Sequence, residues 1–113
     1  MVVREVRHFV NDIKEATSVI VTAVEGKTLE DYKSDIILRL ALERAVEIIS
    51  EASRHIPEHL KATRPEVPWS RVRGIGNVLR HEYHGLPDKI IWGVIQDEIP
   101  RLRVAIDAML DDL

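Results

Sequence analysis

The sequence contains no cysteine, and this absence removes whole classes of site. Without cysteine there is neither a disulfide nor a thiolate ligand for zinc or an iron–sulfur cluster. A chain of this kind is compatible with a reducing compartment, and we expect a cytoplasmic protein. Aromatic residues make up only 4% of the 113 residues, so a tryptophan is expected to anchor the core rather than to stack on nucleic-acid bases.

Long apolar runs are missing as well. No uninterrupted apolar stretch approaches the roughly 18 residues that a membrane-spanning helix requires. The N-terminal stretch is charged throughout and lacks the apolar segment of a secretory signal peptide. We therefore expect no signal peptide and no association with a membrane.

Charge is distributed unevenly along the chain. The net charge is −3, but residues 61–84 hold five basic residues against two acidic ones, which gives this region +3 and leaves −6 for the remainder. A basic patch on an acidic body attracts anions such as phosphate. The alternative is a solvated arginine face that binds nothing. The basic residues of the region are Lys61, Arg64, Arg71, Arg73 and Arg80.

The first part of the chain has the pattern of two helices. Apolar residues recur at three- and four-residue steps over residues 2–25, which predicts an amphipathic helix that Gly26 ends. The stretch from Thr28 to Asp31 has the pattern of a capping box that begins a short helical turn. Ser34 is a second candidate N-cap, for the helix that follows.

The segment from residue 35 to about residue 56 is the most apolar of the chain, and Pro57 is expected to close it. Its apolar residues cover more of the helix circumference than one narrow stripe, so the helix needs cover on two sides. A second copy of the chain is one source of that cover, which leads us to infer a homodimer. A central core helix is the alternative. The apolar residues are Ile36, Ile37, Leu38, Leu40, Leu42, Val46, Ile48 and Ile49.

The second half of the chain continues the helical pattern. Residues 61–69 form a proline-containing connector, and Trp69 is expected to pack against the bundle where the next helix begins. That helix is predicted over residues 70–84. In the last helical segment, Pro100 is expected to introduce a kink or to split the helix in two.

No stretch shows strand alternation, and no internal repeat is visible. The length corresponds to one domain. The sequence therefore predicts a single all-α domain over residues 1–113, folded as an antiparallel bundle of four or five helices.

The stretch from residue 71 to residue 85 is unusual because glycine, asparagine, arginine and histidine crowd into it. On a helix, Arg73, Asn77 and His81 occupy positions i, i+4 and i+8 and form one polar row. Arginine grips phosphate oxygens, asparagine orients a neighbouring group and histidine moves a proton, so this row favours phosphodiester chemistry. The alternative is structural: histidine can interact with the helix C-terminus, and asparagine can cap or bond within the bundle. A separate, apolar face of this helix contains Val72, Ile75 and Leu79.

Two histidine pairs have spacings that metal sites use. His55 and His59 lie four residues apart, but a proline separates them, and His81 and His84 lie three apart. Neither pair has enough further ligands nearby to complete a site. We expect no metal and no cofactor.

The motifs together resemble the HepT-like toxin family, a group of HEPN-type proteins. The resemblance extends over nearly the whole chain, and the order and spacing of the motifs make it more specific than any motif alone. It rests mainly on the motif from Asn77 to Tyr83, and it is extended by residues 45–52, 54–57, 65–69, 91–92 and 99–102.

The resemblance implies an all-helical homodimer in which two copies of the motif meet at the dimer interface. It also implies metal-independent RNA cleavage, and a minimal nucleotidyltransferase antitoxin that can transfer AMP to the motif tyrosine. Carried over to this sequence, His81 transfers protons, Asn77 supports it and Tyr83 is the site of modification. On a regular helix Tyr83 lies about 200° from His81, so one pocket can receive both only if the helix unwinds or a dimer partner supplies one of them.

One position departs from the family pattern. The family usually has an arginine directly before the motif asparagine, where this chain has Gly76. Arg73, on the polar row, is the candidate replacement for phosphate binding, and Arg80 is a second basic residue beside His81. Three hypotheses follow: a ribonuclease toxin that is weakened or re-wired, a non-catalytic helical partner of a minimal nucleotidyltransferase, and a purely structural helical dimer.

Overall fold

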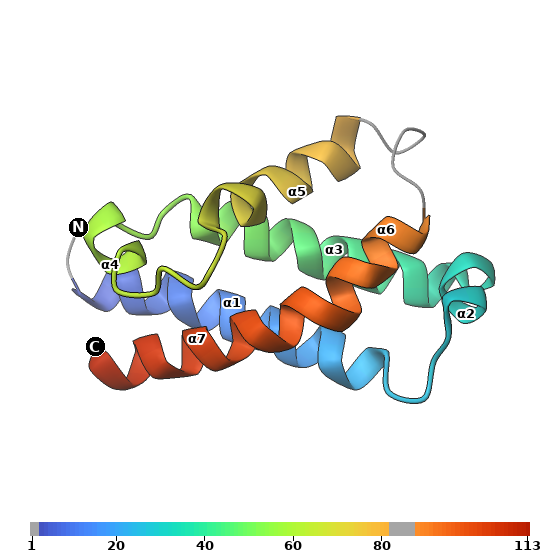
Figure 1. The fold of residues 1–113 in the computed structure, drawn as a ribbon, viewed down its shortest axis with the longest axis horizontal. Helices are drawn as coiled ribbons and strands as arrows, with labels where there is room; N and C mark the ends of the chain where they lie inside the picture. Colours follow the sequence, from blue (N-terminus) through green and yellow to red (C-terminus); the bar gives the residue numbers. More distant parts are fainter. Residues whose placement is uncertain (1–2, 82–87) are drawn as a thin grey trace.

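Four long helical segments that alternate in direction make up most of the molecule (Figure 1). The structure, a computed structural model, describes the backbone of residues 3–81 and 88–113 and the side chains of residues 5–76 and 88–113. The long segments are α1 (Val3–Ala23), α3 (Ile36–Ser53), α5 (Trp69–His81) and a C-terminal run of α6 (Asp88–Gly93), η1 (Val94–Glu98) and α7 (Ile99–Asp112). Two short helices are α2 (Leu29–Ser34) and α4 (Glu58–Lys61). Within the described ranges there is no β-strand, and the predicted all-α antiparallel bundle is confirmed.

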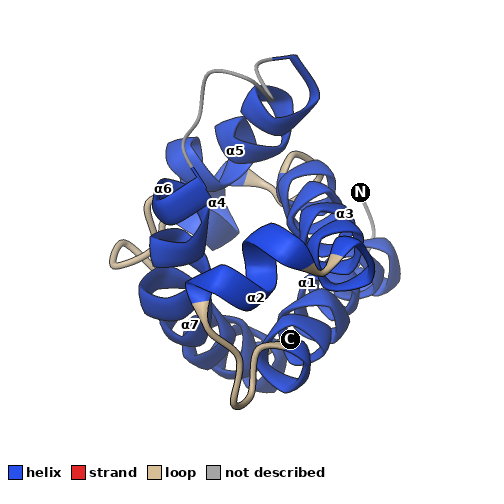
Figure 2. Ribbon diagram, turned by 90° about the vertical axis from the view of Figure 1, so that its right-hand side faces the viewer, coloured by secondary structure: helices blue, strands red, loops and turns tan. Residues whose placement is uncertain are grey.

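The long helices form an open ring around one core, as the end-on view in Figure 2 shows. Helix α1 packs against both α3 and α7, and α5 packs against α3. The order around the ring is therefore α5, α3, α1, α7, and α5 lacks an equally extensive contact with α7. The core consists of the apolar faces of these helices, including Val10, Ile13, Ile20, Leu42, Ile49, Ile95 and Ile106.

The predicted boundary signals of the first two helices are confirmed. Gly26 follows the end of α1 with a φ of +73°, a left-handed conformation that glycine adopts at low cost. The capping box is complete: the Thr28 N–H donates to Oδ2 of Asp31 over 2.9 Å, and the Asp31 N–H donates to Oγ1 of Thr28 over 3.2 Å. Local sequence therefore sets the turn between α1 and α2.

The N-cap predicted at Ser34 is wrong by one residue. Asp35 is the N-cap of α3, and its Oδ1 accepts from the N–H groups of Ile37 and Leu38 over 3.1 and 3.2 Å. The Ser34 hydroxyl instead donates to the Glu30 carbonyl inside α2. The carboxylate is the better cap because its negative charge also interacts favourably with the helix N-terminus.

The region around Pro57 also differs in detail from the prediction. Helix α3 ends at Ser53, about three residues before the predicted end, and the next residues form a turn. Pro57 then begins α4, a short helix that the sequence did not lead us to expect. Because proline tolerates the start of a helix and not its interior, one residue both separates α3 from α4 and begins α4.

Pro100 interrupts the C-terminal helical run as predicted. The five residues of η1, immediately before Ile99, form a π-helix in which the Ile99 N–H donates to the Val94 carbonyl. Proline has no N–H to continue the α-helical pattern and its ring crowds the carbonyl four residues earlier, so the backbone widens before it. The run therefore continues as α7 after a change of register.

Helix α3 packs against α1, α2 and α5, but its N-terminal part is only partly covered. Leu38, Leu42 and Ile49 lie in the core. Three further apolar side chains stay largely exposed, with exposed fractions of 62% for Ile36, 78% for Ile37 and 57% for Leu40. The wide apolar surface predicted for this helix is thus present, and the single chain leaves part of it open.

Candidate functional site

The helix that carries the predicted motif, α5, is anchored at its first residue by Trp69. The indole N–H of Trp69 donates to the carbonyl oxygens of Lys61 and Arg64, both over 3.1 Å. The ring is half-buried and packs against the core. The predicted role of this tryptophan as a bundle anchor is confirmed, and it determines where α5 begins.

Further along, α5 lies directly on α3. Val72 and Ile75 are half-buried against the core, whereas Arg73 is exposed. The Ser50 hydroxyl of α3 donates to the Arg73 carbonyl over 2.5 Å. Gly76 is buried at the same contact, where a Cβ on this residue would stand 2.7 Å from both Cβ and Oγ of Ser50. The two helices therefore approach each other closely at the position where the family pattern has an arginine.

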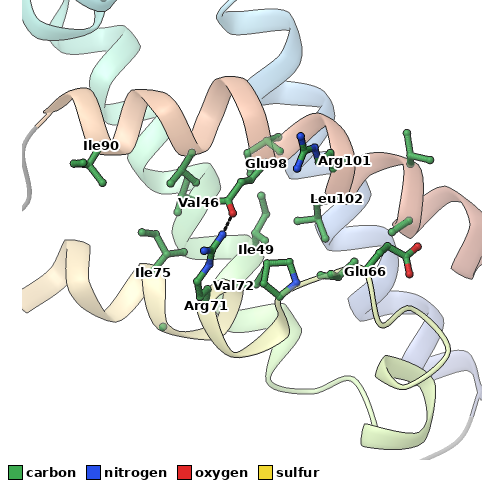
Figure 3. A pocket seen from close by; sticks show the side chains of 17 residues that line it. Val46, Ile49, Glu66, Arg71, Val72, Ile75, Ile90, Glu98, Arg101 and Leu102 are labelled. Carbon is green, nitrogen blue, oxygen red and sulfur yellow. Dashed lines mark ion pairs between the residues drawn. The ribbon is translucent and has the colours of Figure 1, made fainter.

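On its other side, α5 borders a cavity of about 990 Å³ that separates it from η1 and α7 (Figure 3). Apolar side chains line most of it, among them Val46, Ile75 and Leu102. An ion pair between Arg71 of α5 and Glu98 of η1 crosses the cavity. Helix α5 is thus held by close packing on the α3 side and by an ion pair on the opposite side.

The described structure contains only part of the predicted polar row. Arg73 has an exposed side chain and forms no ion pair with a described residue. Asn77, Arg80 and His81 lie in α5, which is a continuous helix from Trp69 to His81, but their side chains are outside the described residues. Tyr83 lies outside the described backbone, as do Glu82, His84 and Gly85. The row remains a prediction whose helical backbone is in place.

The predicted basic patch is largely neutralised by contacts that the sequence does not show. Lys61 is buried and pairs with Glu58 over 3.6 Å, and Arg64 pairs with Asp112 over 2.5 Å. Since Arg71 pairs with Glu98, three of the patch's basic residues have acidic partners. The prediction of a broad basic patch is wrong for these residues: the partners of Arg64 and Arg71 come from distant parts of the chain, and that of Lys61 lies three residues before it. Among the basic residues of the region whose side chains the structure describes, Arg73 is exposed and has no ion pair with another described residue.

A polar cluster that the sequence did not reveal begins α6, just after the undescribed segment. Arg39 of α3 donates to Asp88 over 2.7 Å and pairs with Glu43 over 3.3 Å. The hydrogen bond from Arg39 lowers the pKa of Asp88. The guanidinium also lies 4.9 Å from the ring centre of Tyr32, whose burial raises its pKa to about 12. The partners are up to 49 residues apart, so no local pattern could have identified the cluster.

Metal ligands do not gather in the part of the chain that the structure describes: no three histidine, aspartate or glutamate side chains form a group there. His55 pairs with Glu51 over 3.5 Å, and His59 lies on the separate helix α4. No described helix is long and apolar enough to span a membrane.

Residues 9–109 match the family model described as "Ribonuclease HepT-like". The chain is 33% identical over 104 residues to "Putative RNase TTE0752" of Caldanaerobacter subterraneus subsp. tengcongensis, covering 92% of this chain and 93% of that protein. It is 33% identical over 100 residues to "Probable ribonuclease HepT" of Thermococcus cleftensis, covering 88% and 91%. It is 29% identical over 104 residues to "Putative RNase MJ1380" of Methanocaldococcus jannaschii, covering 92% and 95%. No solved structure gives a significant match.

Proposed function

The chain belongs to the HepT-like ribonuclease family, and from this premise we propose that it is a metal-independent endoribonuclease, the toxin of a toxin–antitoxin pair. RNA is the substrate, and a minimal nucleotidyltransferase is the antitoxin. The protein acts as a homodimer in the cytoplasm. The family assignment supports the ribonuclease, and the residues of α5 support the chemistry.

The chemistry needs a proton-transfer group and a cation. His81 takes the proton from a ribose 2′-hydroxyl or gives one to the leaving 5′-oxygen, since histidine exchanges protons near neutral pH. The 2′-oxygen loses its proton and bonds to phosphorus, the bond from phosphorus to the 5′-oxygen breaks, and the 5′-oxygen gains a proton. The phosphate carries one negative charge before and after the step, and its oxygens carry additional negative charge in the transition state. Arg73 neutralises that charge, Asn77 orients the reacting groups, and Arg80 is a second phosphate contact.

The observation that carries this proposal is that the Arg73 side chain is exposed and has no ion pair with a described residue. Arg73 lies on α5 one helical turn before Asn77, and the neighbouring Arg71, in contrast, pairs with Glu98. An arginine that is not already paired is available to a phosphate. It therefore takes the part that the family pattern gives to an arginine at position 76.

The proposed dimer uses the exposed apolar surface of α3. Ile36, Ile37 and Leu40 occupy the N-terminal part of α3, at the same end of the bundle as the C-terminal end of α5 (Figure 1). Exposed apolar residues grouped in this way favour a protein interface. A second copy is proposed to cover them, and the family resemblance implies that two copies of the motif then meet at the interface.

RNA cleavage by the purified protein, with a chelator present, tests the catalytic roles. We expect His81→Ala to abolish cleavage and Arg73→Ala to lower the rate roughly 10²–10³-fold, the usual effect of removing a group that stabilises transition-state charge. His59→Ala and Arg101→Ala are matched controls, because both residues are exposed and lie on other helices. Wild-type protein that does not cleave RNA under these conditions would exclude the ribonuclease.

A second candidate function is favoured by Gly76, because the usual arginine is absent there and Ser50 leaves no room for it. In this alternative the chain is a non-catalytic helical partner of a minimal nucleotidyltransferase. Tyr83 is the proposed AMP acceptor in both cases. We expect the nucleotidyltransferase to label the wild-type chain with AMP and not Tyr83→Phe, as measured by intact mass. Labelling and complex formation without any RNA cleavage would favour this alternative.

A further inference from the structure

Beyond its anchor at Trp69, the position of α5 relative to the rest of the molecule depends mainly on one packed face. The helix has its extensive helix–helix contact with α3, and the cavity lies between it and η1 and α7. The ion pair from Arg71 across that cavity is largely exposed, and exposed pairs add little stability. Whatever sets the contact between α3 and α5 therefore also sets the place of the proposed catalytic row.

Ser50 is the polar residue of α3 at that contact. Its side chain is almost completely buried, and its hydroxyl donates across the helix boundary to the Arg73 carbonyl, 2.5 Å away. The Ser53 hydroxyl donates to the Ser50 carbonyl within α3. The Ser50 hydroxyl instead donates to a residue of another helix. The bond ends on the backbone of the residue whose side chain is proposed to bind phosphate. It fixes that turn of α5 against α3 and leaves the Arg73 side chain in solvent.

Gly76 is the counterpart of Ser50 on α5. A Cβ at this position would stand 2.7 Å from Ser50 Cβ and 3.5 Å from the Glu47 Cα. Rotating the serine hydroxyl cannot relieve the contact with its Cβ, so the helices would have to separate. Gly74, two residues earlier on α5, has open space beside it, since a Cβ there would meet no atom within 4 Å other than those of its neighbours in the same helix. A side chain therefore fits at position 74 of α5 but not at position 76.

We propose that Ser50 is a positioning residue for the ribonuclease. Together with Gly76 it sets the distance and rotation of α5 on α3, and so the place of Arg73, Asn77 and His81. It also excludes an arginine at position 76, which leaves the role of that arginine to Arg73. This inference rests on the proposed ribonuclease function.

The test compares Gly76→Ala with its matched control Gly74→Ala, and adds the double variant Gly76→Ala/Ser50→Gly. Because misplacing reacting groups by about 1 Å can cost 10²-fold, we expect Gly76→Ala to lower kcat for RNA cleavage by about that factor. Gly74→Ala should cleave like wild type. Removing the Ser50 side chain makes room for the new methyl group but also removes the hydrogen bond to the Arg73 carbonyl, so the double variant should recover only part of the lost rate. All rates are taken well below the melting temperature of each variant, with KM measured alongside kcat.

Amide hydrogen exchange supplies a readout that does not require catalysis. We expect Gly76→Ala to speed exchange in α5, Gly74→Ala to leave it unchanged, and the double variant to restore part of the protection. Equal rates and equal protection for Gly76→Ala and wild type would overturn the inference, as would a double variant no better than Gly76→Ala. If wild type cleaves no RNA, the proposed function fails. The exchange results then still decide whether Ser50 and Gly76 set the position of α5.

Discussion

Tyr32 is a single residue with a polar group in an unfavourable place. Its side chain is fully buried among α2, α3 and α6, and its hydroxyl has no hydrogen-bond partner among the described residues. Arg39 and Trp92 lie against the ring of Tyr32 rather than its hydroxyl. The guanidinium carbon of Arg39 is 4.9 Å from the centre of the Tyr32 ring, and the ring centre of Trp92 is 5.8 Å from it. A buried donor without a partner lowers stability.

We expect Tyr32→Phe to raise the free energy of unfolding by about 1 kcal/mol, since it removes the unsatisfied hydroxyl and keeps the ring. Burial raises the pKa of Tyr32 to about 12 from the ordinary 10. The folded state therefore holds its proton more tightly, so stability should fall as the pH rises from 10 through 12 and should not depend on this group below pH 10. Thermal melts across this range are the measurement. Tyr32→Phe should lose this part of the pH dependence, and an unchanged profile would contradict the assignment.

Gly76 gives a second prediction for a single residue, in which the family pattern and the structure disagree. Restoring the family arginine with Gly76→Arg would raise cleavage if only the motif mattered. We expect it instead to lower both cleavage and the melting temperature, because Ser50 occupies the required space. Steady-state cleavage and a thermal melt of the same preparation decide the matter. A more active Gly76→Arg enzyme would show that α5 adapts to the larger side chain.

Individual helices were predictable where their boundaries depend on nearby residues. The capping box, Gly26 and the break before Pro100 all follow from contacts within a few positions, and all are found. The N-cap of α3 was missed by one residue because Ser34 and Asp35 are both good caps, and only the backbone conformation decides between them.

The corrected N-cap is testable at the level of this helix. Asp35→Ala should lower the free energy of unfolding by about 1 kcal/mol, since two N–H groups of α3 lose their acceptor. Ser34→Ala is the matched control, and it should have a clearly smaller effect because the Ser34 hydroxyl bonds only to a carbonyl that α2 already uses. Chemical denaturation of both variants measures the difference. A larger loss for Ser34→Ala would restore the original prediction.

At the level of the whole molecule, the exposed apolar face of α3 predicts how two chains would associate. We expect Leu40→Glu to convert a wild-type dimer into a monomer, because a charge buried in an apolar interface is unfavourable. Val104→Glu is the matched control: Val104 is 72% exposed but lies on α7. Sedimentation velocity separates the two states. Equal dimer dissociation constants for wild type and Leu40→Glu would exclude this face as the interface.

The sequence by itself determined the long helices, most of their ends, the antiparallel bundle and the segment that carries the motif. These depend on apolar periodicity, caps, glycine and proline, whose effects reach only a few residues along the chain. Tertiary structure decided which charges are already paired and which helix faces touch. Asp88 and Asp112 lie almost 50 residues from their arginine partners, and Ser50 lies 23 residues from Arg73. Such contacts form only when the chain has folded, so the sequence could locate Gly76 and the structure alone could show why no arginine fits there.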